Sequence, residues 1–107
     1  MSPTRRSLAH LNELGYQARV VEQWNPFAQV RQDLFGGDLL ALKPGEPVLV
    51  IQTTSRSNHA ARRKKLAASG FARLWHQAGA VMELWSWAKQ GPRGQRKTWQ
   101  LKREGLS

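Results

Sequence analysis

Asp38 and Gln52 lie at the outer ends of two aliphatic runs and are the polar residues best placed to bind a metal ion or a substrate. A Pro/Gly segment around Gly45 separates the runs, so this part of the chain is expected to form a β-hairpin. In the antiparallel register centred on that glycine, Leu40 lies opposite Val50 and the acid lies opposite the amide. Directly opposed side chains share a face at about 5 Å. The hairpin is therefore expected to end in a pair of oxygen ligands.

Each of these residues also has a structural interpretation. Asp38 follows two glycines and can simply close a turn, while Gln52 can be a hydrogen-bonded amide of the core. A site with one carboxylate would hold a hard cation weakly, so a second acid is expected, and Glu22 and Asp33 are the candidates. Asp33 can instead pair with Arg31.

The charge balance favours a polyanionic partner. The 107-residue chain has 17 Lys and Arg against 7 Asp and Glu, a formal net charge of +10. It contains no cysteine, no apolar run of membrane-spanning length and no apolar amino-terminal signal, so a cytoplasmic protein without membrane contact is expected. The basic run Arg62–Lys65 is either a solvated helix face or a nucleic-acid contact. The length predicts a single domain over 1–107.

The hydrophobic pattern predicts an α/β fold in the order αβββαββ, with a mixed sheet flanked by helices. The long helix is expected to present Ala67, Phe71, Leu74 and Ala78 as one apolar stripe, and Gly70 is expected to kink it or divide it into two abutting helices. The strand after this helix is expected to return beside the hairpin. The expected elements are a helix over 4–14, a strand over 16–24, the two hairpin strands around Gly45, a helix over 57–78, and strands over 81–87 and 97–103.

The first hairpin strand carries an acid, and the second carries a Gln two residues before another polar side chain. This arrangement resembles the motif of the PD-(D/E)XK nuclease superfamily. On that resemblance Asp38 corresponds to the motif aspartate, Gln52 to its Glu or Gln, and Thr54 to its lysine. The wider pattern resembles small phage-type proteins of this superfamily, some of them Holliday junction resolvase-like, and runs through residues 21–26, 31–36 and 52–58.

The resemblance implies a DNA endonuclease that uses Mg²⁺, for which Mn²⁺ can substitute, and that acts on DNA, including branched DNA, as a homodimer. Metal ligands are expected among Asp38, Gln52, Glu22 and Asp33. The expected catalytic residues are Asp38, Gln52, Glu22 and Thr54. The DNA contacts are expected at Arg31, Asn58, Arg62, Arg63, Lys64 and Lys65.

Thr54 departs from the motif because it cannot supply an ammonium group, which Lys64 or Lys65 would have to replace. Two alternatives therefore stay open: a catalytically silent nucleic-acid-binding module on the same fold, and a basic RNA-binding domain. The three histidines lack metal-ligand spacing, and the five tryptophans are expected mostly in the core, with one or two able to stack on bases.

Overall fold

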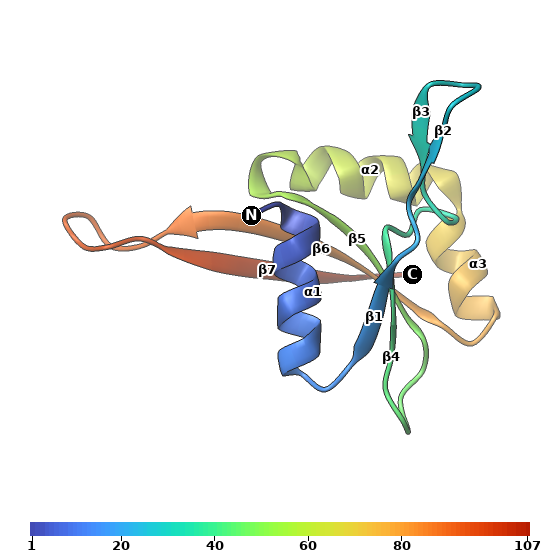
Figure 1. The fold of residues 1–107 in the computed structure, drawn as a ribbon, viewed down its shortest axis with the longest axis horizontal. Helices are drawn as coiled ribbons and strands as arrows, with labels where there is room; N and C mark the ends of the chain where they lie inside the picture. The colour runs from blue at the N-terminus through green and yellow to red at the C-terminus, as the bar shows by residue number, and fades with distance from the viewer.

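A mixed five-stranded sheet forms the centre of this α/β protein, with helices on both of its faces (Figure 1). The structure is a computed structural model and describes residues 1–107. The strand order in the sheet is β1-β4-β5-β6-β7, and β2 and β3 form a separate hairpin. The elements are α1 (Pro3–Glu13), β1 (Gln17–Val20), β2 (Gln23–Asn25), β3 (Val30–Gln32), β4 (Leu39–Leu42), β5 (Leu49–Ser55), a 3-10 turn η1 (Arg56–Asn58), α2 (His59–Ser69), α3 (Phe71–Gln77), β6 (Val81–Gln90) and β7 (Thr98–Leu106).

The central strand β5 pairs antiparallel with β4 and parallel with β6. The chain reaches β6 by crossing over through α2 and α3, so the strand after the long helix does return beside the hairpin, as predicted. β7 then pairs antiparallel with β6, and β1 pairs antiparallel with β4 at the opposite edge. The predicted α/β class and mixed sheet are confirmed, whereas the β2–β3 hairpin is an insertion that the pattern did not indicate.

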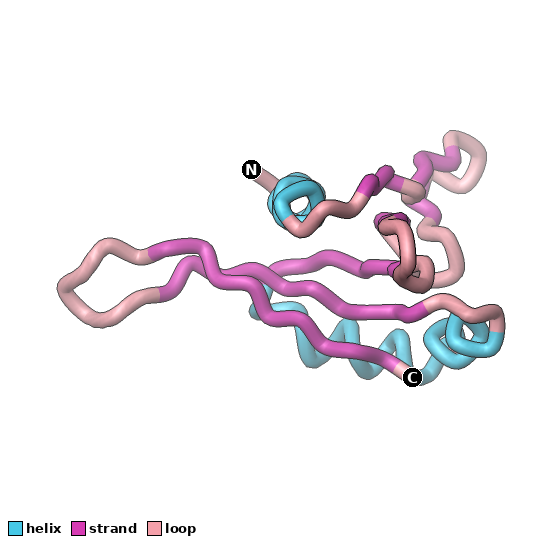
Figure 2. Tube along the Cα trace, turned by 90° about the horizontal axis from the view of Figure 1, so that it is seen from below, coloured by secondary structure: helices cyan, strands magenta, loops and turns pink.

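Different helices bury the two faces of the sheet, because successive side chains of β5 point to opposite sides. Leu49 and Ile51 pack in one cluster with Leu11 of α1. Val50, between them, packs in a second cluster with Leu66 of α2. Figure 2 shows the same division, with α1 on one side of the sheet and α2 and α3 on the other. This three-layer arrangement fixes β5 in the interior along most of its length.

The predicted strand over 16–24 is wrong in extent, because β1 leaves the sheet after Val20. The Val21 N–H donates to the Asp38 carbonyl oxygen at 2.8 Å, and the chain then turns away from β4. The next residues pair with β3 instead, since the Asn25 side chain accepts the Phe27 N–H at 3.0 Å and closes a tight turn. Local turn chemistry therefore diverts half of the expected strand into the β2–β3 hairpin.

Gly70 divides the predicted helix over 57–78 into α2 and α3, which confirms the alternative of two abutting helices. Its φ of +74° lies in the left-handed region, where a helix ends and glycine is favoured. The predicted apolar stripe is wrong: Leu66 and Ala72 are buried, while Leu74 is exposed. Residues on either side of a left-handed glycine no longer follow one helical period. None of the three helices is long and apolar enough to cross a bilayer.

Candidate active site

The β4–β5 hairpin brings Asp38 and Gln52 to the same end of the strand pair. Its ladder joins Leu40 to Val50 and ends one residue further along each strand, which confirms the predicted register. The Asp38 N–H still donates to the Ile51 carbonyl oxygen at 2.9 Å, so this residue stays attached to β5 beyond the last pair. The candidate ligands therefore lie where the ladder opens and backbone donors become available.

The Asp38 carboxylate is tied to the backbone of β5 rather than to the Gln52 amide. Its Oδ2 accepts the Thr53 N–H at 2.9 Å, and the residue is only 7% exposed. This bond satisfies a donor of β5 beyond the end of β4, a structural role different from the turn closure considered from the sequence. The other carboxylate oxygen, Oδ1, accepts no hydrogen bond and is left for a further partner.

Burial raises the pKa of Asp38 from its ordinary 3.8 to about 6, because the charged form loses solvation. The Thr53 N–H acts against this by stabilising the carboxylate. Two nearby acids, Glu22 and Asp33, raise the pKa further, and the positive charge of Arg62 lowers it. An added cation would therefore offset the negative charge around this carboxyl group and lower its pKa.

Gln52, which the hairpin register places opposite Asp38, holds an unpaired acceptor. Its Nε2 donates to the Gly36 carbonyl oxygen at 2.9 Å, and the residue is 5% exposed. Its Oε1 is buried and has no hydrogen-bond partner. Such an orphaned oxygen costs about 1–3 kcal/mol, so a partner is expected for it. Half of the side chain behaves as a core amide, and the other half is a buried oxygen without a partner.

Glu22 precedes β2 and Asp33 follows β3, so both lie at the open end of the β2–β3 hairpin, and both act electrostatically on Asp38. Glu22 is half-buried and takes part in no salt bridge. Asp33 accepts the Gly36 N–H on Oδ1 at 3.0 Å, so one of its oxygens shapes the turn that leads to β4. The suggested ion pair between Asp33 and Arg31 is absent, and Glu22 is therefore the less committed second acid.

The predicted DNA contacts separate into different environments. Arg62 is half-buried and is the cation that acts on the Asp38 carboxyl group, whereas Lys64 and Lys65 are exposed. Arg63 forms a 3.1 Å salt bridge with Glu104 of β7. That Lys64 or Lys65 replaces the motif's lysine stays a prediction, and Arg62 is the basic residue of α2 whose charge lowers the pKa of Asp38.

Three further residues lie around this centre in distinct ways. Thr54 is buried on β5 and its side chain makes no hydrogen bond, so it contributes no charge. Asn58 lies in η1 and donates from Nδ2 to the Ser55 hydroxyl at 3.1 Å. Arg31 is exposed on β3, where it lines a hollow of about 490 Å³ together with Asp33 and Phe71. Of the four candidate metal ligands, only Asp33 lines this hollow.

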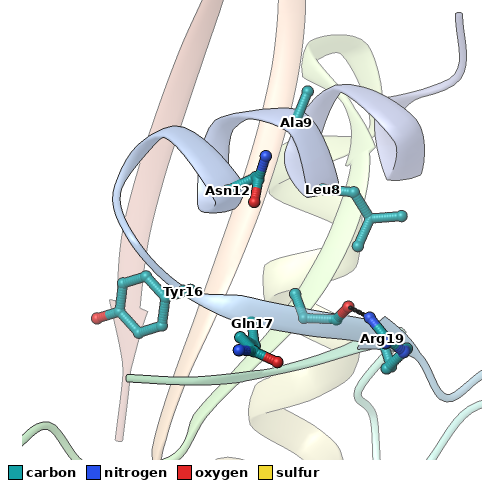
Figure 3. A pocket seen from close by; sticks show the side chains of 7 residues that line it. Leu8, Ala9, Asn12, Tyr16, Gln17 and Arg19 are labelled. Carbon is teal, nitrogen blue, oxygen red and sulfur yellow. Dashed lines mark hydrogen bonds between the residues drawn. The ribbon is translucent and has the colours of Figure 1, made fainter. Parts of the chain in front are cut away.

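A second hollow of about 490 Å³ lies between α1 and the edge strand β1 (Figure 3). Asn12 projects from the helix toward it, and Tyr16 and Arg19 lie at its two ends. The Arg19 Nη1 donates to the Ala18 carbonyl oxygen at 3.0 Å. No carboxylate lines this hollow, so it lacks the ligands that a hard cation needs.

One buried network escaped the sequence analysis. His59 of α2 contacts the Ser86 hydroxyl at 2.6 Å through Nδ1 and the Glu104 carboxylate at 2.7 Å through Nε2. The Arg56 Nε also donates to the Ser86 hydroxyl oxygen at 3.1 Å. The hydroxyl hydrogen is then left to donate to the His59 ring. These are the residue types of a nucleophilic triad, but Ser86 is 0% exposed. The network therefore joins α2 to β6 and β7.

The structure contains no group of three or more His, Cys, Asp or Glu side chains close enough to hold a metal ion. Comparison with known protein families, with curated proteins and with solved structures gave no match. The function has to be argued from the residues themselves.

Proposed function

We propose that this protein is a metal-dependent DNA endonuclease with a PD-(D/E)XK-like fold, which hydrolyses phosphodiester bonds as a homodimer. The observation that carries the proposal is that the hairpin register brings two buried polar residues to the same end of the strand pair. The Asp38 carboxyl group has a pKa of about 6, and the Gln52 carbonyl oxygen has no partner. Branched DNA is the proposed substrate because the motif resembles that of junction-resolving proteins.

The oxygens at this centre fit a hard divalent cation. Asp38 offers an oxygen that accepts no hydrogen bond, Gln52 offers its orphaned carbonyl oxygen, and Glu22 offers a second carboxylate. Mg²⁺ prefers such oxygen ligands, and Mn²⁺ can replace it. A cation held there would polarise the phosphoryl group and favour ionisation of the attacking water. The same cation would lower the pKa of Asp38 and satisfy Gln52.

The basic residues nearby can bind and orient the DNA backbone. Arg62 acts electrostatically on the centre from α2 and can pair with the phosphate next to the scissile bond. Arg31 lines the hollow beside Asp33, where it can contact a neighbouring phosphate. Lys64 and Lys65 face solvent on the same helix and can contact phosphates further along the strand.

The proposal is tested by cleavage assays on a four-way junction, a duplex and single strands, each with Mg²⁺ or Mn²⁺. Asp38→Asn should abolish cleavage while changing DNA affinity by only about two-fold, because the phosphate contacts lie on other residues. Glu46→Gln is the matched control, since this exposed acid lies in the hairpin turn away from the centre. Cleavage by the Asp38 variant at the wild-type rate would overturn the proposed site.

The second candidate is a catalytically silent nucleic-acid-binding module, favoured by the uncharged and buried Thr54 at the motif's lysine position. It predicts that the wild-type protein binds DNA but cleaves none of the three substrates with either ion. Absence of DNA binding would contradict both candidates.

A further inference from the structure

The β6–β7 ribbon extends past the rest of the sheet as a two-stranded arm (Figures 1 and 2). β5 accompanies β6 only as far as the pair Ser55–Trp87, whereas β6 and β7 remain paired to Gln90–Thr98. All residues from 89 to 100 are exposed. The outer part of the ribbon, from Gln90 to Thr98, therefore lies outside the packed core, and the core does not require its length.

The arm carries concentrated and uncompensated positive charge. Its outer part contains Lys89, Arg93, Arg96 and Lys97, and no Asp or Glu occurs between residues 84 and 103. None of the four cations takes part in a salt bridge. Like charges on one short ribbon repel each other, so their concentration is best explained by an anionic partner.

Several of these side chains converge on one concave face. Lys89 is paired with Trp99 across the ribbon, so both side chains lie on the same side. Together with Arg96, Lys97 and Gln95 they line a hollow of about 780 Å³. Trp99 is 44% exposed, which leaves part of its ring available to a ligand. Cations, an amide and an aromatic surface thus face the same space.

Contacts with α1 hold the base of the arm in position. The Trp87 Nε1 donates to the Ser7 hydroxyl at 2.9 Å, and the Arg6 guanidinium lies 3.6 Å from the centre of the Trp99 ring. The cation–π contact also fixes a further positive charge beside the concave face. The arm therefore projects in a direction set by the packed body of the protein.

We propose that this ribbon is an arm that enters the major groove of duplex DNA and binds the phosphates on both sides of it. A two-stranded ribbon fits that groove, which is about 12 Å wide. Phosphate is the anion that its exposed lysines and arginines match. This inference does not depend on the proposed nuclease activity.

The tip of the arm lies within about one turn of B-DNA of the candidate active site. Gln52 is paired in parallel register with Leu84, and Gly94 at the tip is ten residues further along β6 and its turn. Ten residues of extended chain span at most about 33 Å. One turn of B-DNA is about 34 Å long. The hollow of the arm and the centre lie on opposite faces of the sheet, because Trp87 and Trp99 face α1 whereas Gln52 shares the α2 face with Val50.

The test is a triple variant of the tip, Arg93→Ala, Arg96→Ala and Lys97→Ala, measured by fluorescence anisotropy on a 30-base-pair DNA duplex. If each side chain binds a phosphate, the slope of log affinity against log salt should fall by up to about 2.7. Affinity should then decrease at least about ten-fold near 0.1 M salt. The exposed tip carries no core contact, so thermal unfolding by circular dichroism should match the wild type.

A control triple variant, Arg5→Ala, Arg19→Ala and Arg73→Ala, removes the same charge from exposed positions outside the arm and the candidate site. Its affinity should change by less than about two-fold, because salt screens charges beyond about 10 Å. Equal losses in the two triple variants would overturn the arm and leave a merely basic surface. Failure of the wild-type protein to bind the duplex would overturn it as well.

The remaining outcomes separate this inference from the proposed nuclease. If the wild type binds DNA but cleaves nothing, and the tip variant binds more weakly than the control variant, the DNA-binding arm is supported and the proposed nuclease activity is refuted. An RNA duplex should be less sensitive to the tip variant, because its major groove is deep and narrow. An equal loss on RNA would contradict groove entry. A loss confined to anionic phosphatidylserine vesicles would assign the arm to a membrane surface and overturn the proposal.

Discussion

Replacing Asp38 with Asn should stabilise the protein without bound metal at neutral pH. The substitution keeps an oxygen for the Thr53 N–H at nearly constant volume and removes only the charge. In the wild type, burial raises the pKa of Asp38 from 3.8 to about 6. The folded protein therefore holds this proton more tightly than the unfolded chain, so stability is present at low pH and falls as pH rises through about 4 to 6.

The size of the effect follows from the two pKa values. A difference of about two pH units, at about 1.4 kcal/mol for each, gives about 3 kcal/mol as the upper limit. The free energy of unfolding of Asp38→Asn minus that of the wild type should therefore increase by about 1–3 kcal/mol between pH 4 and pH 7.5. Other acids with shifted pKa values, such as Glu83 and Glu104, titrate in both proteins and cancel in this difference.

The measurement is urea unfolding of both proteins at several pH values in EDTA. A difference that stays flat with pH would refute the argument that burial, acting on this one carboxyl group, raises its pKa. Repeating the series with Mg²⁺ adds a second readout. A cation bound by Asp38 should raise the unfolding midpoint of the wild type and leave that of the variant unchanged.

Three further predictions concern the surroundings of the site. Arg62→Ala should slow cleavage more than ten-fold, because it removes a stabilising positive charge from the active site. Lys65→Ala should mainly weaken DNA binding. Single-turnover kinetics at saturating protein separate an effect on cleavage from an effect on binding. Gly37→Ala should cost at least about 1–3 kcal/mol in urea unfolding, because its Cβ would lie 2.5 Å from a buried valine methyl group, while Gly105→Ala, with open space, should change stability by less than about 0.5 kcal/mol. Glu104→Gln should reduce stability at pH 7 but not at acidic pH, because hydrogen bonds from a histidine and an arginine lower the Glu104 pKa and this stabilisation is lost as the carboxylate is protonated. An unchanged pH profile in that variant would contradict the role of the buried network.

The parts of the fold that were predicted correctly depend on local chemistry. The hairpin register follows from the turn at Gly45 and from the alternation of side chains, both of which are encoded within a few residues. The first helix begins beside a Ser2 cap and ends before Gly15, signals that the chain also carries locally. The expected strand over 16–24 failed, because the extent of a strand depends on whether a partner strand runs beside it.

The candidate site divides in the same way. Asp38 and Gln52 are visible in the chain as an acid and an amide that the hairpin register brings to one end, and that much is a property of neighbouring residues. The raised pKa, the orphaned carbonyl oxygen and the electrostatic role of Arg62 are not visible there. Desolvation and Coulomb interactions depend on distances through space, which α2 and the β2–β3 hairpin establish only by packing against the sheet.

The β6–β7 arm and the buried His59 network are consequences of tertiary structure alone. Alternating residues predict strands, but whether a ribbon is covered or projects into solvent depends on where the adjacent β5 ends, at Ser55. His59 and Glu104 are 45 residues apart and meet because β7 returns beside β6 and α2 packs over the same face. Local sequence patterns specify the elements and their registers, whereas burial, charge coupling and exposure arise from contacts between elements distant in the chain.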